Sequence, residues 1–338
     1  MALTINTNVS SLIAQRNLNS ATTKLNSSIE RMTTGFKINH ASDNAAGYSI
    51  SDMWVTQLGS LDVAADNAAT GSDMLTTAEE TYSLLTSHLQ RVRDLTEQAA
   101  NGTYGSQSLK AIQSEIHARL QEVNRISANS EFNGIKLMAY DMNNAANNKE
   151  VGMTARGVDL QVGLYANEYS RINLKVDLFA NASVSGLFKG MTKTSESGKT
   201  LANLLTAAGG DISKLGDDEN LQAFAAACSG LVYDKTKGLT LQTGAEFGAK
   251  EMLAFVDSAI NEISDRVTNI GAAQNRVQSA ISALDVQSQN LTSSLSTLRD
   301  TDVASESSNF IQAQILQQAS ATLLATANQA PSLALNLI

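Results

Sequence analysis

Residues 253–298 read LAFVDSAINEISDRVTNIGAAQNRVQSAISALDVQSQNLTSSLSTL. Alternating steps of three and four residues from Leu253 to Leu298 mark fourteen positions, and only Gln274 and Ser288 among them are polar. No proline interrupts these 46 residues, so the spacing predicts one long helix with a continuous apolar stripe. An isolated helix cannot bury such a stripe, and the pattern therefore predicts partner helices that pack alongside it.

Two further stripes supply candidates for those partners. One runs from Trp54 to Ala99 and another from Leu109 to Ile126, and the linker at residues 101–105 has the two glycines typical of a tight helical turn. We expect the stripes to form the core of a bundle. The positions predicted to line it are Leu85, Leu89, Val92, Ile260, Ile263, Val267, Ile270, Val277, Ile281 and Leu284.

The middle of the chain has a different pattern. Apolar and polar residues alternate in 160–164 and 172–178, which predicts a β-hairpin closed by residues 167–170. Short helices are expected at 199–208 and 219–228, and a last strand pair within 230–241. The predicted fold class is mainly α: a long antiparallel helical bundle or coiled coil that pairs the N- and C-terminal halves, with a β-hairpin and a small inserted α+β outer domain.

The two ends of the chain are helical in pattern but poor in charge. Residues 307–338 contain no charged side chain, and their polar positions are Asn, Gln, Ser and Thr. An ordinary solvated helix face carries charges. The ends are therefore either frayed polar termini or helices buried only after assembly of many copies. The apolar positions expected to pack in an assembly are Leu18, Leu25, Ile29, Met32, Phe36, Ile311, Ile315, Leu316, Leu323 and Leu324.

Composition argues against several classes of function. With 24 Lys and Arg against 33 Asp and Glu, the net charge of −9 offers no basic field for nucleic acid. A lone Cys228 excludes an intramolecular disulfide and a CxxC zinc site, and the three histidines lack metal-ligand spacing. We expect Cys228 to be a packed side chain rather than a nucleophile. No catalytic residue, cofactor or metal is predicted, and neither a cleaved signal peptide nor a membrane span is expected.

Several motifs together carry a family resemblance. The blocks are INTN at 5–8, SIERMTTGFKIN at 28–39, ASDNAAG at 41–47, LQRVRDL at 89–95, EFNGIKL at 131–137, AQILQQA at 313–319 and ATANQAP at 325–331. In this order and separation they resemble bacterial flagellin over about 1–180 and 245–338. Residues 181–244 match no pattern of the family, as its variable outer region would.

The resemblance implies a three-part subunit. Residues 1–47 with 299–338 would form the inner tube, 48–180 with 245–298 the helical bundle plus hairpin, and 181–244 a variable surface domain. It implies a non-enzymatic, extracellular subunit of the flagellar filament, secreted unfolded without a cleaved signal. The implied partners are other copies of the chain, the filament cap, the hook–filament junction proteins, the export chaperone and the export gate.

The resemblance also bears on the basic heptapeptide at 89–95. By spacing alone, Arg91 and Leu95 share a helix face that reads as a solvated stripe. In many flagellins this segment is contacted by the innate immune receptor TLR5, and the matching positions are Arg91 and Leu95, with Glu115 on the neighbouring helix. Two other classes stay open on the residues: a cap or junction protein with flagellin-like ends, and a metallopeptidase in the insert. Residues 181–244 contain no histidine, which disfavours the latter.

Overall fold

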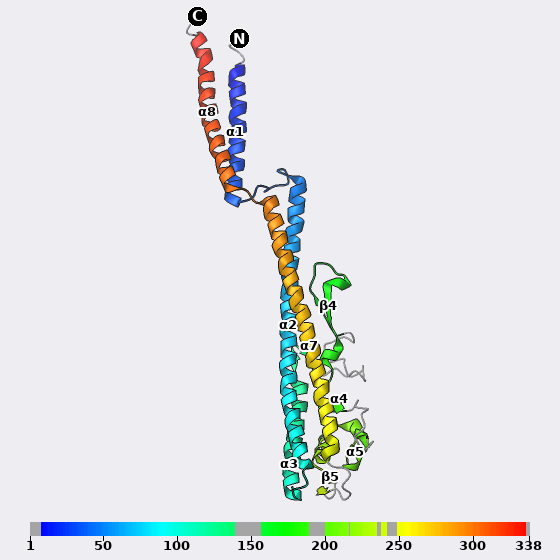
Figure 1. Ribbon diagram of the computed structural model, residues 1–338. Coiled ribbons are helices and arrows are strands. Elements are labelled where there is room, and N and C mark those ends of the chain that lie inside the picture. The colour runs from blue at the N-terminus through cyan, green and yellow to red at the C-terminus, as the bar shows by residue number, and fades with distance from the viewer. Residues whose placement is uncertain are drawn as a thin grey trace. The chain divides into compact units, whose positions relative to one another are not determined.

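The computed structural model describes residues 8–138, 157–188, 200–215, 217–234, 238–241 and 249–335. Most of these residues are helical (Figure 1). The long helices are α1 (Val9–Thr34), α2 (Ala45–Ala100), α3 (Ser106–Asn129), α7 (Ala249–Arg299) and α8 (Val303–Leu335). The shorter elements are β1 (Glu131–Phe132), β2 (Ile135–Lys136), β3 (Val158–Gln161), η2 (Glu168–Ser170), β4 (Arg171–Leu174), η3 (Val176–Phe179), α4 (Val184–Phe188), α5 (Leu201–Ala207), η4 (Ile212–Lys214), α6 (Asp218–Cys228), β5 (Leu231–Asp234) and β6 (Gly238–Leu241).

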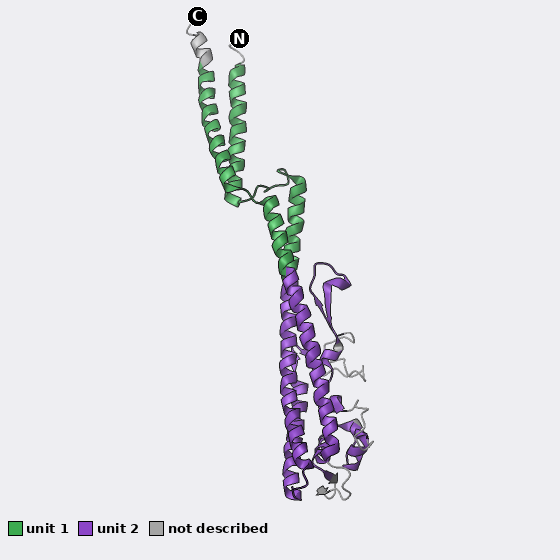
Figure 2. Cartoon of the chain, in the orientation of Figure 1, with its two compact units in different colours: residues 1–62, 285–338 green, residues 63–284 purple. Residues whose placement is uncertain are grey.

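The chain divides into two compact units (Figure 2). One unit contains residues 1–62 and 285–338, and the other contains residues 63–284. Helices α2 and α7 each contribute to both, so the two units are connected through continuous helices. We refer to them as the terminal unit and the bundle unit.

The bundle unit packs α2, α3 and α7 around an apolar core. The predicted stripe of α3 is buried at all six positions from Leu109 to Ile126. Helices α2 and α7 run antiparallel, because Arg93 Nε lies 2.6 Å from Asp257 Oδ1 and Gln274 Nε2 lies 2.8 Å from Glu79 Oε2. Gln274, a polar interruption of the apolar stripe, is thus satisfied by a carboxylate of the facing helix.

The expected core positions lie where the spacing places them. Seven are buried: Leu85, Leu89, Val92, Ile263, Ile270, Val277 and Leu284. The other three are half-buried and pack against the same cluster: Ile260, Val267 and Ile281. The prediction of a long helical bundle that pairs the two halves of the chain is confirmed.

The middle of the chain supplies hairpins and short helices. Strands β3 and β4 pair antiparallel, from Val158 opposite Leu174 to Gln161 opposite Arg171, and β5 pairs with β6. The hairpin itself was predicted correctly, but its strand bounds were not: the first strand was expected at 160–164 and lies at Val158–Gln161, and the second was expected to reach residue 178. It ends at Leu174 because the chain turns into the 3₁₀ helix η3, whose Leu178 and Phe179 are buried in the bundle core.

The terminal unit contains a second antiparallel pair, α1 with α8, which lie side by side (Figure 1). Asn8 begins α1, with its side-chain oxygen accepting a hydrogen bond from the backbone N–H of Ser11. Gly35 ends the helix in the left-handed conformation, φ 76°, which glycine adopts without a steric penalty. The sequence therefore carries both the start and the stop signals of α1.

Candidate functional site

The α1–α8 pair buries small side chains and leaves large apolar ones outside. The buried positions recur every seven residues and are Ala14, Ala21 and Ser28 in α1 and Glu306 and Ala313 in α8. Polar contacts fix the antiparallel alignment: Asn8 Nδ2 donates to Ala327 O at 2.6 Å, and Ser28 Oγ donates to Glu306 Oε1 at 2.6 Å. Small side chains let two helices approach closely but bury little apolar surface.

The apolar residues predicted to pack in an assembly lie mostly on the outside of this pair. Ile29, Met32, Ile311, Ile315, Leu316 and Leu323 are between 38% and 61% exposed. Leu18, Leu25, Phe36 and Leu324 are half-buried. Along α8 the exposed residues line an open groove of about 370 Å³, whose walls include Ile311, Ile315 and Leu316. An exposed surface with several large apolar side chains marks an interaction site.

A second cavity, of about 350 Å³, lies between α1 and α8. Its lining is polar and includes Lys24, Ser28 and Arg31 from α1 with Glu306 and Asn309 from α8. Within the part of the chain that is described, Arg31 Nε is buried without a hydrogen-bond partner. Glu306, only 6% exposed, accepts from Ser28 and from the Asn309 amide.

A short connector joins the ends of the terminal helices to α2 and α7. The backbone N–H of Lys37 donates to Arg299 O at 2.6 Å, and that of Thr301 donates to Gly35 O at 2.9 Å. The Arg299 guanidinium stacks 3.9 Å from the Phe36 ring centroid, a cation–π contact. Hydrogen bonds and a cation–π contact therefore hold the connector in a defined conformation.

One carboxylate organises the turn that follows the connector. The Asp43 side chain accepts hydrogen bonds from the backbone N–H groups of His40 and Asn39, each at 3.1 Å, and these bonds hold the pKa of Asp43 below its ordinary value. The turn therefore keeps its hydrogen bonds as long as Asp43 is ionised.

The residues matched to a receptor contact lie on α2 and α3. Arg91 Nε donates to Glu115 Oε1 at 2.8 Å, and both side chains are more than a third exposed. Arg119 lies 3.7 Å from the same carboxylate, and the pairing with Glu115 raises the pKa of Arg91. Leu95 is only 2% exposed. The structure thus brings Arg91 and Glu115 together at the surface and places Leu95 beneath it, in the bundle core.

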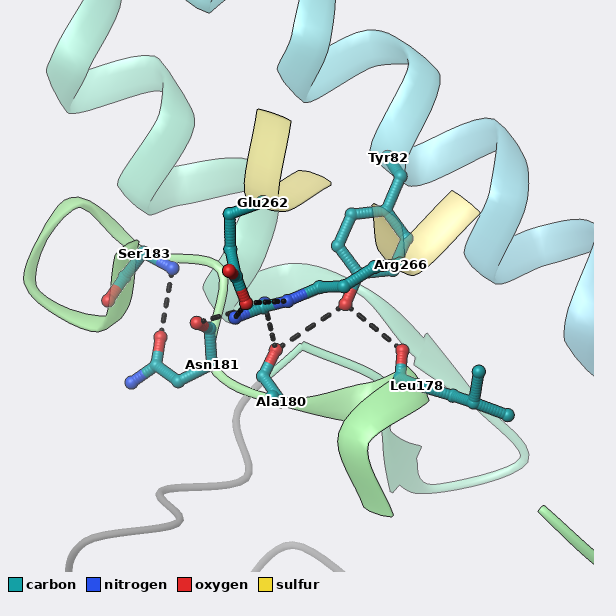
Figure 3. Close-up of polar contacts among 7 residues, drawn as sticks. All are labelled: Tyr82, Leu178, Ala180, Asn181, Ser183, Glu262 and Arg266. Atoms are coloured by element: carbon teal, nitrogen blue, oxygen red, sulfur yellow. Dashed lines mark hydrogen bonds and ion pairs between the residues drawn. The ribbon is translucent and has the colours of Figure 1, made fainter. Parts of the chain in front are cut away.

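A polar cluster that no sequence pattern indicates is buried in the bundle unit (Figure 3). Arg266 of α7 is 7% exposed and donates from Nη1 to Ala180 O at 3.0 Å and to Asn181 O at 3.3 Å, while Glu262 pairs with its guanidinium. The Tyr82 hydroxyl of α2 donates to Leu178 O at 3.0 Å. Burial raises the pKa of Tyr82, so its hydroxyl stays protonated and available as a donor. We call Arg266 and Tyr82 the carbonyl clamp, because they satisfy backbone carbonyls of residues 178–181.

The helix α6 of the middle segment is attached to α3 by a shared carboxylate. Asp218 Oδ1 lies 3.0 Å from His117 Nε2 and accepts from Gln121 Nε2 at 2.7 Å. Asp218 and Glu219 lie in the first turn of α6, where acidic side chains interact favourably with the helix dipole.

Cys228, the last residue of α6, is fully buried as a free thiol that hydrogen-bonds with Thr96 of α2. Burial raises the pKa of this thiol to about 12, well above its ordinary value. A thiol that stays protonated is a poor nucleophile, so the prediction of a packed, unreactive cysteine is confirmed.

The raised pKa of Cys228 predicts a loss of stability in alkali. The unfolded chain releases this proton above pH 9 and the folded chain does not, so its contribution is complete below pH 9 and falls between pH 9 and 12. Between pH 8 and pH 10 we expect the free energy of unfolding to fall by about 1 kcal/mol more in the parent than in Cys228→Ala. Urea unfolding at both pH values measures this difference, and equal losses in the two proteins would contradict it.

Among the described residues, no group of His, Cys, Asp and Glu side chains is arranged to hold a metal ion. In the same residues, no helix has both the length and the apolar character that crossing a bilayer requires. The described residues form two sets of paired long helices, and large apolar side chains are exposed on α1 and α8. This defines a long-helical protein with an exposed apolar surface of the kind that marks an interaction site.

Comparisons with known proteins identify the subunit. Residues 5–142 match the family model of the bacterial flagellin N-terminal helical region, and residues 253–338 match that of the bacterial flagellin C-terminal helical region. The chain is 35% identical to polar flagellin F of Vibrio parahaemolyticus and 34% identical to flagellin B of Vibrio cholerae and of Vibrio anguillarum, each over the full length of both chains. The chain belongs to the bacterial flagellin family. It is a structural, non-enzymatic subunit of the extracellular flagellar filament, and it polymerises with itself for motility.

Proposed function

We propose that α1 and α8 supply the contacts that drive polymerisation and form the inner tube of the filament. The observation that carries this proposal is the row of large apolar side chains left exposed on the α1–α8 pair, including Ile311 and Ile315 at 52% and 59%. Neighbouring copies would cover these side chains, and their burial is the favourable term of assembly. An assembly whose contacts repeat without closing grows as an open helical polymer.

We propose that three parts of the chain have separate positions in the filament. Residues 1–47 with 299–338 form the inner tube, 48–180 with 245–298 form the helical bundle and hairpin, and 181–244 form the variable surface domain. The connector at Gly35 to Lys37 and Arg299 to Thr301 supports the first boundary, since it separates α1 and α8 from the helices that follow and precede them.

Point variants on α8 test the role of the terminal helices. The double variant Ile311→Asn/Ile315→Asn should raise the critical concentration for polymerisation by roughly tenfold or more, because it removes two side chains from the buried contact. The matched control, Gln314→Ala/Gln318→Ala, changes exposed polar residues of the same helix and should polymerise as the parent does. Sedimentation of filaments at graded protein concentrations gives both values. Parent-like growth of the asparagine variant would contradict the proposal.

We further propose that the chain leaves the cell unfolded through the flagellar export channel, with the export chaperone and gate as partners. Its ends would stay loose until they dock at the tip. The cap and the hook–filament junction proteins would contact the growing and the basal ends of the filament. The uncharged segment 307–338 supports this role, because it carries no charge that would oppose close packing of many copies.

We also propose that the Arg91–Glu115 surface of the monomer is a contact for TLR5. The exposed pair at 2.8 Å supports it, with Arg119 beside them and the buried Leu95 holding the surface from beneath. The same surface would be covered in the filament, so recognition would require monomers.

Signalling by monomers tests this contact. Arg91→Ala should weaken TLR5 activation by about tenfold, as removal of a central charged contact does at protein interfaces. Arg125→Ala is the control, since Arg125 is an exposed arginine of α3 that is paired within its own helix to Glu122. A reporter-cell titration with monomers of each variant compares them, and equal potency of Arg91→Ala and the parent would defeat the proposal.

A further inference from the structure

The α1–α8 contact contains little that distinguishes one alignment of the helices from another. Its buried positions in α1 are Ala14, Ala21 and Ser28, and those in α8, among residues of described burial, are Glu306 and Ala313. Each set repeats at seven residues, so a shift of one helix by two turns would again place small side chains against small side chains. Alanine contacts alone do not select an alignment.

Ser28 and Glu306 differ from the other buried positions because they are polar. Each is 6% exposed, and Ser28 Oγ donates to Glu306 Oε1 at 2.6 Å. We propose that this hydrogen bond is the register lock of the terminal helices: it selects the one alignment of α1 with α8 that the filament uses. The proposal rests on the proposed role of these helices in assembly and adds the residues that position them.

Shifting either helix by seven residues shows how the lock discriminates. One shift places Glu306 opposite Ala21, and the opposite shift places Ser28 opposite Ala313, beyond reach of Glu306. In both cases the buried carboxyl group loses its hydroxyl donor. A buried polar group without a partner costs more than the hydrogen bond itself contributes, so both shifted alignments are disfavoured.

Basic side chains lie near the Ser28–Glu306 hydrogen bond. Lys24 and Arg31 line the cavity beside Glu306 and provide positive charge near its carboxyl group. Other polar contacts of the helix pair are more accessible to water. They are Asn8 Nδ2 with Ala327 O at 2.6 Å, Ser11 Oγ with Asn328 Oδ1 at 2.7 Å and Gln317 Nε2 with Thr22 Oγ1 at 3.3 Å. Water can replace those contacts after a shift, whereas it reaches the Ser28–Glu306 pair poorly.

The connector supports the same alignment at one end of the helices, through Lys37 N to Arg299 O. The connector lies just outside α1 and α8, whereas the Ser28–Glu306 lock lies between the two helices. Variants of Ser28 and Glu306 therefore test the lock without changing the connector. Their shared consequence is that the exposed apolar residues of α1 and α8, such as Ile29 and Ile311, keep a fixed offset for docking onto neighbouring copies.

Disulfide cross-linking reads the alignment directly. In a Cys228→Ser background, Ala21→Cys with Ala313→Cys reports the native register, and Ala14→Cys with Ala313→Cys reports a shift of seven residues. Each pair is oxidised in assembled filaments, and a denaturing gel separates intramolecular from intermolecular products. Variants that assemble poorly are incorporated as a minor component with parent protein, so that the register is still measured.

Four variants then test the lock. Ser28→Ala/Glu306→Ala should lower the ratio of native to shifted cross-link by about tenfold, the effect expected for the loss of one buried hydrogen bond to a carboxyl group. Ser28→Ala should lower it similarly. Ser28→Thr and Glu306→Gln keep the donor and the acceptor and should retain the parent ratio. This pattern of rescue would not arise if Ser28 and Glu306 only filled space.

A parent-like ratio in Ser28→Ala/Glu306→Ala would overturn the register lock and assign the alignment to the connector. A failure of the broader assembly role looks different, because then Ile311→Asn/Ile315→Asn would polymerise normally whatever the cross-links show. The two proposals can therefore fail independently.

Discussion

A chain that ends at residue 306 should form no filaments at any accessible concentration while its bundle unit stays folded. The truncation removes residues 307–338 and with them nearly all of α8, including the exposed Ile311, Ile315 and Leu323. It also removes the partner of α1, so neither terminal helix can present its apolar face in a fixed arrangement. The loss should be complete rather than graded, because under the proposed assembly each copy would use this surface toward several neighbours.

The bundle unit should survive this truncation because its core is independent of α8. Residues 63–284 form a compact unit with buried side chains from α2, α3, α7 and the middle segment. Hydrogen exchange should show protected amides in α3 and in the first half of α7 in both the truncated and the full chain. Electron microscopy and sedimentation measure polymerisation. Long filaments made by the truncated protein would show that α8 is dispensable and would contradict the proposal that α1 and α8 drive polymerisation.

The long helices and their contact faces were predictable because a heptad pattern states both the helix and the side it buries. Ile263, Ile270 and Val277 were assigned to the core from spacing alone, and all are fully buried. The β3–β4 hairpin was predictable for the same reason, with a period of two. Local periodicity is sufficient where a single face of an element is buried.

Periodicity does not predict the burial of a side chain that is covered by a distant segment of the chain, because the spacing of apolar residues does not say where that segment packs. Leu95 shares a face with the exposed Arg91 by spacing, yet it is buried, and Thr96 beside it contacts Cys228 of α6. The middle segment thus widens the buried face of α2 beyond the stripe. Arg266 lies next to the stripe position Val267 in the sequence. Its burial was not predicted, because its partners are backbone carbonyls that no sequence pattern reveals.

Replacing Arg266 should destabilise the bundle unit far more than replacing an exposed arginine of the same helix. Arg266→Met keeps much of the side-chain volume but leaves the Asn181 carbonyl without its guanidinium donor and leaves Ala180 O with only the 3.5 Å contact from the Tyr82 hydroxyl. Loss of a buried charged donor to such groups costs about 3 kcal/mol of unfolding free energy. Arg266→Lys should recover part of this, since an ammonium group has fewer and less directed donors than the guanidinium.

The carbonyl clamp makes a further, sharper prediction. Tyr82→Phe removes the donor to Leu178 O and should cost about 1 kcal/mol, but the double variant Tyr82→Phe/Arg266→Met should cost less than the sum. Both side chains hold the same segment, so once one is lost the segment relaxes and the other has less to stabilise. Arg276→Ala, an exposed arginine of the same helix, is the control and should change stability by less than about 0.5 kcal/mol.

Urea unfolding followed by circular dichroism, with hydrogen exchange of α7, measures these changes in the unit where they occur. Tryptophan fluorescence would not, since the single Trp54 lies in the terminal unit. Additive losses in the double variant would mean that Tyr82 and Arg266 act on separate parts of the structure. A loss in Arg266→Met no larger than that of Arg276→Ala would mean that the carbonyls of residues 178–181 find water when the guanidinium is gone, and that the middle segment is held to the bundle by its apolar contacts alone.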